Sequence, residues 1–359
     1  MSPVRIVVME GDGIGPEITA AMLTVLHAAD RAFGLGLEFT AESVGFAALR
    51  AFGTTFPDAA EAAARAADGV ILGPVSHNDY PPVVQGGLNP SGELRKRLDL
   101  FANIRPARSR GGFPPRCGSP VDLVVVRENT EGFYADRNMF MGLGEFMPTP
   151  DVALAVRKIT RAGATRIAEA AFTLAMQRRR QVTAVHKANV LRVSDGFYLD
   201  CTRAVAARFP QVRYEEKIID AMAALLVRDA AAFDVIVTTN MFGDILSDLA
   251  SEIAGSLGLA ASLNAGADYA VAQAQHGSAP DIAGQDIANP ASLISSAAML
   301  LAWLGERRGH DGLSAAAATI EAALDRAIEQ TDWRTRDLGG LVGTQAFGER
   351  VAELVGETP

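Results

Sequence analysis

The chain has 359 residues, of which 49% are hydrophobic and 21% charged, which is typical of a globular protein large enough for two domains. Its formal net charge of -9 argues against a nucleic-acid partner, because such surfaces need clustered positive charge. Two cysteines without metal-ligand spacing argue against a disulfide framework, and we find neither a signal segment nor an apolar stretch of membrane-spanning length. We therefore expect a cytoplasmic protein without a membrane partner.

Short strand-like runs alternate with alanine-rich helical runs along the chain. The predicted strands are 4–9, 69–72, 123–126, 182–186 and 235–239. The predicted helices include 59–67, 161–177 and 199–208. Alternation of this kind favours an α/β fold with substantial parallel sheet. The least regular stretches are 78–90, 109–120 and 137–150.

The first predicted strand runs into a glycine-rich turn with the sequence GDGIGPE, residues 11–17 with Glu17 last. A dinucleotide-binding fingerprint needs G-x-G-x-x-G and an acidic residue after the second strand. The spacing is instead G-x-G-x-G, and no acidic residue follows 37–40 in a convincing place. Pro16 suits the first turn of a helix, so a helix is expected to begin here. The spacing alone disfavours a Rossmann fold, and a structural turn is at least as good an interpretation.

Arginines gather in the next third of the chain. Arg105 and Arg127 each lie beside an apolar strand, and Arg127 stands where a parallel strand is expected to end, the usual edge for ligand sites. Several converging arginines favour a di- or tricarboxylate ligand, because the guanidinium fork matches a carboxylate. In the alternative interpretation, at least part of the run 95–97 lies on the solvent-exposed face of a helix.

Two further segments carry weaker signals. Lys187 directly follows an apolar strand, where a desolvated lysine can act as a general acid or base, although a surface lysine is the ordinary alternative. The segment 276–284 is rich in Gly, Ser and Pro, which suits backbone contacts to phosphate or adenine. Within it, Asp281 can bind a ribose diol and would repel a 2′-phosphate.

The strongest cluster is FDVIVTTNMFGDILSDL, a buried strand followed by a turn and a helix that carries Asp244 and Asp248. Residues four apart share one helix face. Stabilisation of the helix dipole accounts for one aspartate better than for two, because like charges at this spacing repel. A divalent cation relieves the repulsion, and oxygen ligands suit Mg²⁺ or Mn²⁺. The spacing therefore favours a metal site.

Together these segments resemble the β-decarboxylating dehydrogenases, the family of isocitrate, isopropylmalate, homoisocitrate and tartrate or D-malate dehydrogenases. The matching segments, in the family's order, are GDGIGPE, LRKRLDLFANIRP, VVVRENTEGFY, VHKANVL, FDVIVTTNMFGDILSDL, HGSAPDIAGQDIANP and TRDLGG. The resemblance implies an isocitrate/isopropylmalate dehydrogenase-like α/β fold, not a standard Rossmann fold, with two α/β domains and a cleft between them. The large domain would comprise 1–100 and 254–359, and the smaller inserted domain 101–253.

The resemblance also implies a homodimer, or a pair of dimers, whose active sites are shared between subunits. An arm that begins near 138–150 would clasp the partner. The residues expected to bind substrate carboxylates are Arg95, Arg105 and Arg127. Those expected to hold Mg²⁺ or Mn²⁺ are Asp220, Asp244 and Asp248.

Two residues are expected to handle protons in the family's oxidative decarboxylation. Lys187 would help remove the substrate's hydroxyl proton as hydride passes to the nicotinamide. Tyr134 would protonate the enolate left after loss of CO₂. The resemblance further implies that Lys187 and Asp220 act in the site of the neighbouring subunit.

The expected cofactor is NAD, held chiefly by the loop 276–289. The residues expected to contact it are His276, Gly277, Ser278, Ala279, Asp281, Ile282 and Asn289. NAD is favoured over NADP because the carboxylate of Asp281 beside a 2′-phosphate is costly, while Arg336 in TRDLGG leaves NADP open. The approach to the loop, AQAQHG at 272–277, departs from the family's FEPVHG and suggests altered cofactor affinity or an unusual substrate.

The segment before Arg95, GGLNPSGE, bears on the substrate. It lacks the leucines that cover an isopropyl group in isopropylmalate enzymes, and it carries Asn89 and Ser91 where isocitrate enzymes have a serine and an asparagine. We therefore expect isocitrate or a close polar analogue, with D-malate or tartrate next and 3-isopropylmalate disfavoured. The alternatives from other classes are a non-catalytic regulatory subunit of a heteromeric isocitrate dehydrogenase and a metal-free hydroxyacid dehydrogenase.

Overall fold

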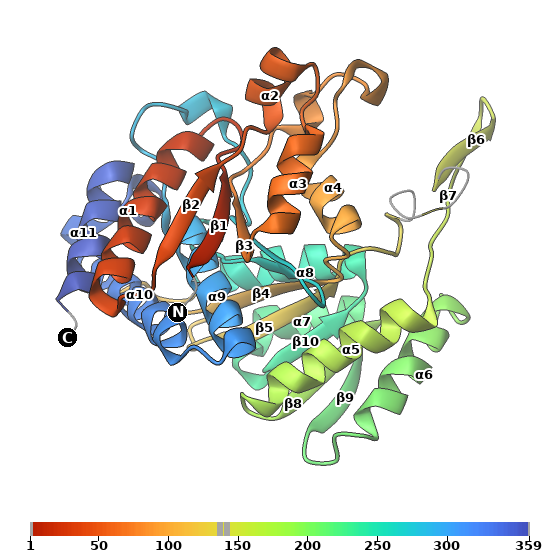
Figure 1. Cartoon of the computed structure of the whole chain (residues 1–359). Coiled ribbons are helices and arrows are strands. Elements are labelled where there is room, and N and C mark those ends of the chain that lie inside the picture. The colour runs from red at the N-terminus through yellow and green to blue at the C-terminus, as the bar shows by residue number, and fades with distance from the viewer. Residues whose placement is uncertain (1–2, 135–138, 140–143, 358–359) are drawn as a thin grey trace.

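The computed structural model describes residues 3–134, 139 and 144–357, and within these residues the fold is built on one sheet of ten strands (Figure 1). The strands are β1 (Val4–Met9), β2 (Leu37–Ala41), β3 (Gly69–Leu72), β4 (Ala102–Arg108), β5 (Asp122–Glu128), β8 (Gln181–His186), β9 (Arg213–Ile218), β10 (Val235–Thr238), β11 (Leu263–Ala265) and β12 (Ala270–Gln273). They lie in the order β2-β1-β3-β12-β11-β4-β5-β10-β8-β9.

The sheet consists of two parallel halves that run in opposite directions. β2, β1, β3 and β12 are parallel to one another and form the first half, and β5, β10, β8 and β9 form the second half. Between them, β11 and β4 pair antiparallel with each other and with their outer neighbours. The prediction of an α/β fold with substantial parallel sheet is confirmed, and the antiparallel pairs lie at the junction of the halves.

Helices cover both faces of each half (Figure 1). The helices are α1 (Gly15–Phe33), α2 (Gly45–Phe52), α3 (Asp58–Ala66), α4 (Pro90–Arg97), α5 (Arg161–Met176), α6 (Ser194–Ala206), α7 (Ile219–Asp229), α8 (Asn240–Ala254), α9 (Ala291–Arg308), α10 (Asp311–Glu329) and α11 (Thr344–Gly356). Ile6 and Val8 of β1 pack against α1, α9, α10 and α11, while Val7 and Met9 face α3 and α4. A strand buried on both faces is typical of parallel sheet, which is why its sequence is apolar throughout.

The second half has the same layered plan. Val124 and Val126 of β5 share a core with α5 and α6, while Leu123 and Val125 share one with α7 and α8. No helix in the described part of the chain is both long enough and apolar enough to cross a membrane. The division into 1–100 with 254–359 and 101–253 stays a prediction.

Most of the predicted elements form. β1 and β3 have the predicted bounds, β5, β8 and β10 begin or end within two residues of theirs, and α1 begins with Pro16 in its first turn. The interpretation of 137–150 as irregular is wrong for β6 (Glu145–Thr149), which pairs with β7 (Val152–Ala155), while 137–138 and 140–143 lie outside the described residues. The β6–β7 hairpin stands away from the sheet (Figure 1), and its side chains are exposed.

The glycine-rich turn after β1 supports the loop 276–289. Ile14 donates its backbone N–H to the carbonyl oxygen of Ser278 at 2.8 Å. Gly13 has a φ of 58°, and a Cβ at this position would lie 2.0 Å from the same oxygen. The structural interpretation of the turn is therefore correct, because glycine permits both this backbone conformation and this close approach.

Replacing Gly13 tests this contact, and Gly34 provides a matched control. Gly34 has nearly the same conformation, with a φ of 62°, but no atom lies within 4 Å of a Cβ built there. Alanine at either position costs about 1–2 kcal/mol for the left-handed backbone. We expect Gly13→Ala to lose a further ~1–3 kcal/mol of unfolding free energy through the clash with Ser278, and to weaken the NAD binding that the sequence predicts for the loop 276–289. Equal denaturation midpoints and NAD affinities for the two variants would contradict this.

Candidate functional site

A polar cavity of about 260 Å³ lies where the two halves of the sheet meet. Its walls come from α4, β4, β5, α8 and the segments that follow β3 and β12. The structure brings together in it nine of the residues predicted from the sequence: Asn89, Ser91, Arg95, Arg105, Arg127, Tyr134, Asp244, His276 and Gly277. Asp248 lies beside the cavity, one helical turn beyond Asp244, so residues spread over more than half of the chain meet at one site.

Strand alternation places two of the arginines in the cavity. Successive side chains of a strand point to opposite faces, so Arg127 follows Leu123 and Val125 on the face of β5 that α8 covers. β4 runs antiparallel to β5, and Asn103 is the direct neighbour of Arg127 in the pairing. Arg105 has the same parity as Asn103, so its side chain also reaches α8. Both guanidinium groups are buried.

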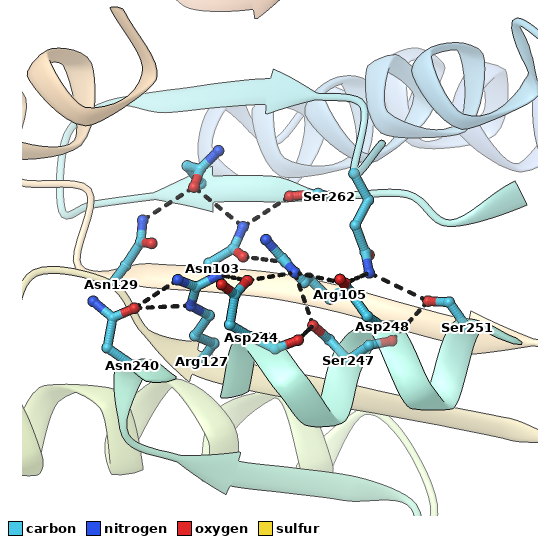
Figure 2. A network of polar contacts seen from close by, with 12 residues as sticks. Asn103, Arg105, Arg127, Asn129, Asn240, Asp244, Ser247, Asp248, Ser251 and Ser262 are labelled. Atoms are coloured by element: carbon cyan, nitrogen blue, oxygen red, sulfur yellow. Dashed lines mark hydrogen bonds and ion pairs between the residues drawn. The ribbon is translucent and has the colours of Figure 1, made fainter. Parts of the chain in front are cut away.

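Arg127 is held by α8 through polar contacts from all three of its guanidinium nitrogens (Figure 2). Its Nε and Nη2 donate to Oδ1 of Asn240 at 2.9 and 2.7 Å, and its Nη1 donates to Asp244. The helix approaches closely because residue 243 is glycine, where a Cβ would lie 2.6 Å from Cγ of Arg127. The position of this guanidinium is therefore fixed by three residues within the first five of α8, namely Asn240, Gly243 and Asp244.

Arg105 connects the two aspartates (Figure 2). Its Nη1 donates to Oδ1 of Asp244 at 3.2 Å, to Oδ1 of Asp248 at 3.3 Å and to Oγ of Ser247 at 2.8 Å. Its Nε donates to Oδ1 of Asn103 at 2.5 Å. Burial lowers the pKa of the Arg105 guanidinium, and the negative charges of the two aspartates oppose that shift. The positive charge of Arg105 therefore reduces the repulsion between the two carboxylates. From the sequence alone, a bound divalent cation was expected to have this effect.

A metal site within one chain is incomplete. In the described residues, no three His, Cys, Asp or Glu side chains converge as metal ligands. Asp244 and Asp248 supply two carboxylates of the kind that Mg²⁺ and Mn²⁺ prefer, so the donor chemistry fits and one further ligand is needed. Asp220, the third predicted ligand, begins α7 and does not line the cavity.

Lys187 and Asp220 lie together, outside the cavity, at the end of β8 and the start of α7. Lys187 donates from Nζ to Oδ1 of Asp220, and this contact lowers the pKa of the Asp220 carboxyl. The backbone N–H of Lys187 donates to Oδ2 of Asp195 at 2.5 Å, and Asp195 is fully buried and paired with Arg157. Asp195 thus fixes the turn that carries Lys187, while the ammonium group of Lys187 stays accessible. Its predicted role in a neighbouring subunit stays a prediction.

The loop 276–289 follows β12 and carries the remaining predicted residues. Ser278 and Asn289 are buried, and Nδ2 of Asn289 donates to Asp337 of the TRDLGG segment at 2.9 Å. Ala279 has a φ of 38° and precedes the short turn Pro280–Ile282. The side chain of Asp281 is exposed, so it is available to a ligand such as a ribose diol.

His276 begins this loop with an unsatisfied acceptor. Its Nδ1 lies 3.0 Å from the carbonyl oxygen of Gly277, which can only accept, so the neutral ring carries its proton on Nδ1. Its Nε2 is buried without a hydrogen-bond partner among the described residues, and burial lowers the pKa of the imidazole. A buried acceptor at the edge of the cavity fits a ligand that donates a hydrogen bond.

The sequence analysis missed five polar residues that complete the site: Asn103, Asn240, Ser247, Gln273 and Gln275. Asn240 and Ser247 stand inside the quoted aspartate motif, and their spacing from Asp244 on one helix was the available signal. Gln273 accepts a hydrogen bond from Oγ of Ser91 at 2.9 Å. Asn89 caps α4 by accepting from the N–H of Gly92 at 3.2 Å, so it positions the helix that carries Arg95.

Comparisons with known proteins agree over the whole chain. The family model described as isocitrate/isopropylmalate dehydrogenase matches residues 5–351. The isocitrate/homoisocitrate dehydrogenase of Thermus thermophilus is 43% identical over 98% of both chains, and the 3-isopropylmalate dehydrogenase of Archaeoglobus fulgidus is 40% identical over 98% of this chain and 99% of its own. The crystal structure of isocitrate dehydrogenase from Methylococcus capsulatus has 39% identity and a TM-score of 0.86, covering 99% of this chain and all of that one.

The pKa of His276 predicts a measurable dependence of stability on pH. The unfolded chain protonates this imidazole near its ordinary pKa of 6.5, whereas the folded chain resists protonation. Stability is therefore lost as the pH falls below 6.5. We expect His276→Asn to show a shallower decline of the denaturation midpoint than the wild type between about pH 6.5 and pH 5. Parallel curves for the two proteins would contradict a depressed pKa at this residue.

Proposed function

The chain belongs to the isocitrate/isopropylmalate dehydrogenase family, and from this membership we propose that it catalyses the NAD- and divalent-metal-dependent oxidative decarboxylation of a 3-substituted (2R)-malate. The observation that carries the proposal is the convergence of Arg95, Arg105 and Arg127 on one cavity. Among the described lining residues, Asp244 is the one carboxylate. Three guanidinium groups face Asp244 in the cavity and Asp248 beside it, which still leaves an excess of positive charge that suits a di- or tricarboxylate substrate.

The wall near Ser91 supports isocitrate or a close polar analogue. The hydroxyl of Ser91 donates to Oε1 of Gln273, so the amide nitrogen of Gln273 is turned away from Ser91 and remains a donor. A hydrogen-bond donor in a cavity rich in arginine suits a third carboxylate better than an isopropyl group. The alternatives are tartrate or D-malate, whose small polar substituents tolerate the same wall, and 3-isopropylmalate, the substrate in the name of the Archaeoglobus relative.

Each part of the proposed reaction is assigned to particular residues of the chain. The three arginines would bind and orient the substrate carboxylates, and Asp244 and Asp248 would hold the cation with Asp220 of a second copy. When bound, NAD supplies the hydride acceptor and the cation supplies a Lewis acid for the hydroxyl oxygen. Lys187 of the second copy would accept the hydroxyl proton, and Tyr134 would return a proton to the carbon that loses CO₂. The presence of this whole set argues against a non-catalytic regulatory subunit.

The preference for NAD is proposed from Asp281. An exposed carboxylate at this position suits a free ribose hydroxyl and repels a 2′-phosphate. Arg336 is also exposed and could offset that repulsion, so NADP is included in the test below. Binding of NAD would also bring ligand atoms next to Nε2 of His276, which has no hydrogen-bond partner among the described residues.

A homodimer is supported by the placement of Lys187 and Asp220 outside their own chain's cavity. Apolar side chains are exposed on or next to three helices of the same half of the sheet, with Val193 87% exposed before α6, Val227 58% exposed on α7 and Ile245 57% exposed on α8. We propose that the partner subunit covers them. The exposed β6–β7 hairpin is the arm that we propose clasps the partner (Figure 1).

The substrate is tested by NADH formation with Mn²⁺ against isocitrate, homoisocitrate, 3-isopropylmalate, D-malate and both tartrates. We expect the highest kcat/KM for isocitrate, a lower kcat/KM with NADP than with NAD, and loss of activity with EDTA. A clear preference for 3-isopropylmalate would contradict the polar interpretation of Ser91 and Gln273 while leaving the reaction class standing. Turnover that resists EDTA and releases no CO₂ would instead favour a metal-free hydroxyacid dehydrogenase.

Shared sites are tested by complementation between two inactive variants. A heterodimer of one Lys187→Met chain and one Asp244→Asn chain contains one intact site and one doubly defective site if lysine and aspartate come from different subunits. We expect this heterodimer, purified through two different tags, to recover up to half the wild-type activity, while each homodimeric variant stays inactive. A folded but inactive heterodimer would show instead that both residues act within one chain.

A further inference from the structure

Gln275 connects the segment that leads into the loop 276–289 with the aspartate helix α8. Its Nε2 donates to Oδ1 of Asp248 at 2.6 Å and lies 3.4 Å from Oγ of Ser251. It lies two residues after β12 and directly before His276. Its backbone N–H donates to Oγ of Ser292 at 3.3 Å, so the residue is anchored on α9 as well.

The orientation of the Gln275 amide follows from its partners. An ionised carboxylate can only accept, so the amide nitrogen must face Asp248. Ser251 donates its own hydroxyl proton to the carbonyl oxygen of Ser247 at 2.8 Å, so it too can only accept from Gln275. Oε1 of Gln275 is buried without a partner among the described residues, and Gln275 is one of the residues that line the cavity.

We propose that Gln275 is a positioning residue for Asp248 in metal binding, an inference that rests on the proposed function. Gln275 and Arg105 both donate to Oδ1 of Asp248, and no contact of the described residues involves Oδ2, which leaves that oxygen for a cation. Arg105 is also one of the residues that bind substrate carboxylate. Once substrate draws Arg105 away, the neutral amide of Gln275 keeps Asp248 oriented without cancelling the charge that attracts the cation.

The test is the affinity of the full-length protein for Mn²⁺ alone, measured by titration calorimetry or by the electron paramagnetic resonance of free Mn²⁺. Gln275→Met keeps the length of the side chain but removes the donor, and we expect it to weaken Mn²⁺ binding about tenfold. At saturating Mn²⁺ its kcat should return close to that of the wild type, which a general loss of structure would not allow. The second variant is Gln275→Val, which introduces the valine that the family segment FEPVHG has at this position. It should weaken Mn²⁺ binding to the same extent.

Gln177→Met is the matched control, because Nε2 of Gln177 also donates to a carboxylate oxygen, that of Glu306 at 3.0 Å, on the surface and far from the cavity. It should bind Mn²⁺ as the wild type does. Wild-type affinity in both Gln275→Met and Gln275→Val would overturn the proposal. A wild-type protein that binds no Mn²⁺ would overturn the metal requirement itself, so the two failures are told apart by which protein shows them.

Discussion

The centre of the structure depends on two buried guanidinium groups that must be paired. Arg105 and Arg127 lie where the sheet changes direction, and a buried charge without partners would cost several kcal/mol. α8 supplies those partners from one face, with Asp244 between the two arginines. The surrounding amides and hydroxyls follow from the same need, because each guanidinium has five N–H donors to satisfy. The junction of the two sheet halves is therefore held by polar contacts where most of the sheet is held by apolar packing.

These contacts also define what the cavity can bind. A substrate carboxylate that takes over an arginine leaves an aspartate without its counter-ion, and a divalent cation can then replace the guanidinium at that aspartate. The substrate carboxylate adds negative charge to the site and the cation adds positive charge, so binding of an anionic substrate and of a cation would favour each other. This coupling requires Asp248 to keep its orientation when Arg105 moves, and a neutral donor such as Gln275 meets that requirement.

Local sequence patterns were sufficient to predict much of the site. Contacts between residues that are distant in the sequence could not be predicted from them. The helix spacing of Asp244 and Asp248 and the strand-end position of Arg127 follow from periodicity alone. The bridging role of Arg105 depends on the antiparallel register of β4 and β5, which no local pattern encodes. The Ser91–Gln273 contact joins residues 182 positions apart. β6 was missed because Pro148 removes one backbone donor and the segment lacks the alternation of apolar and polar residues that indicates a strand.

The pair of Lys187 and Asp220 differs in kind from the pairs in the cavity. Its side chains are partly exposed, at 27% and 68%, and an ion pair exposed to solvent contributes little to stability. The buried contact of Asp195 with the backbone of Lys187 fixes the turn, whereas nothing comparable fixes the ammonium and carboxylate. Because the turn is rigid and the ion pair is weak, the ammonium and carboxylate groups can change partners at little cost in free energy. This arrangement supports the proposal that both residues complete the cavity of another subunit, where they would exchange each other for new partners.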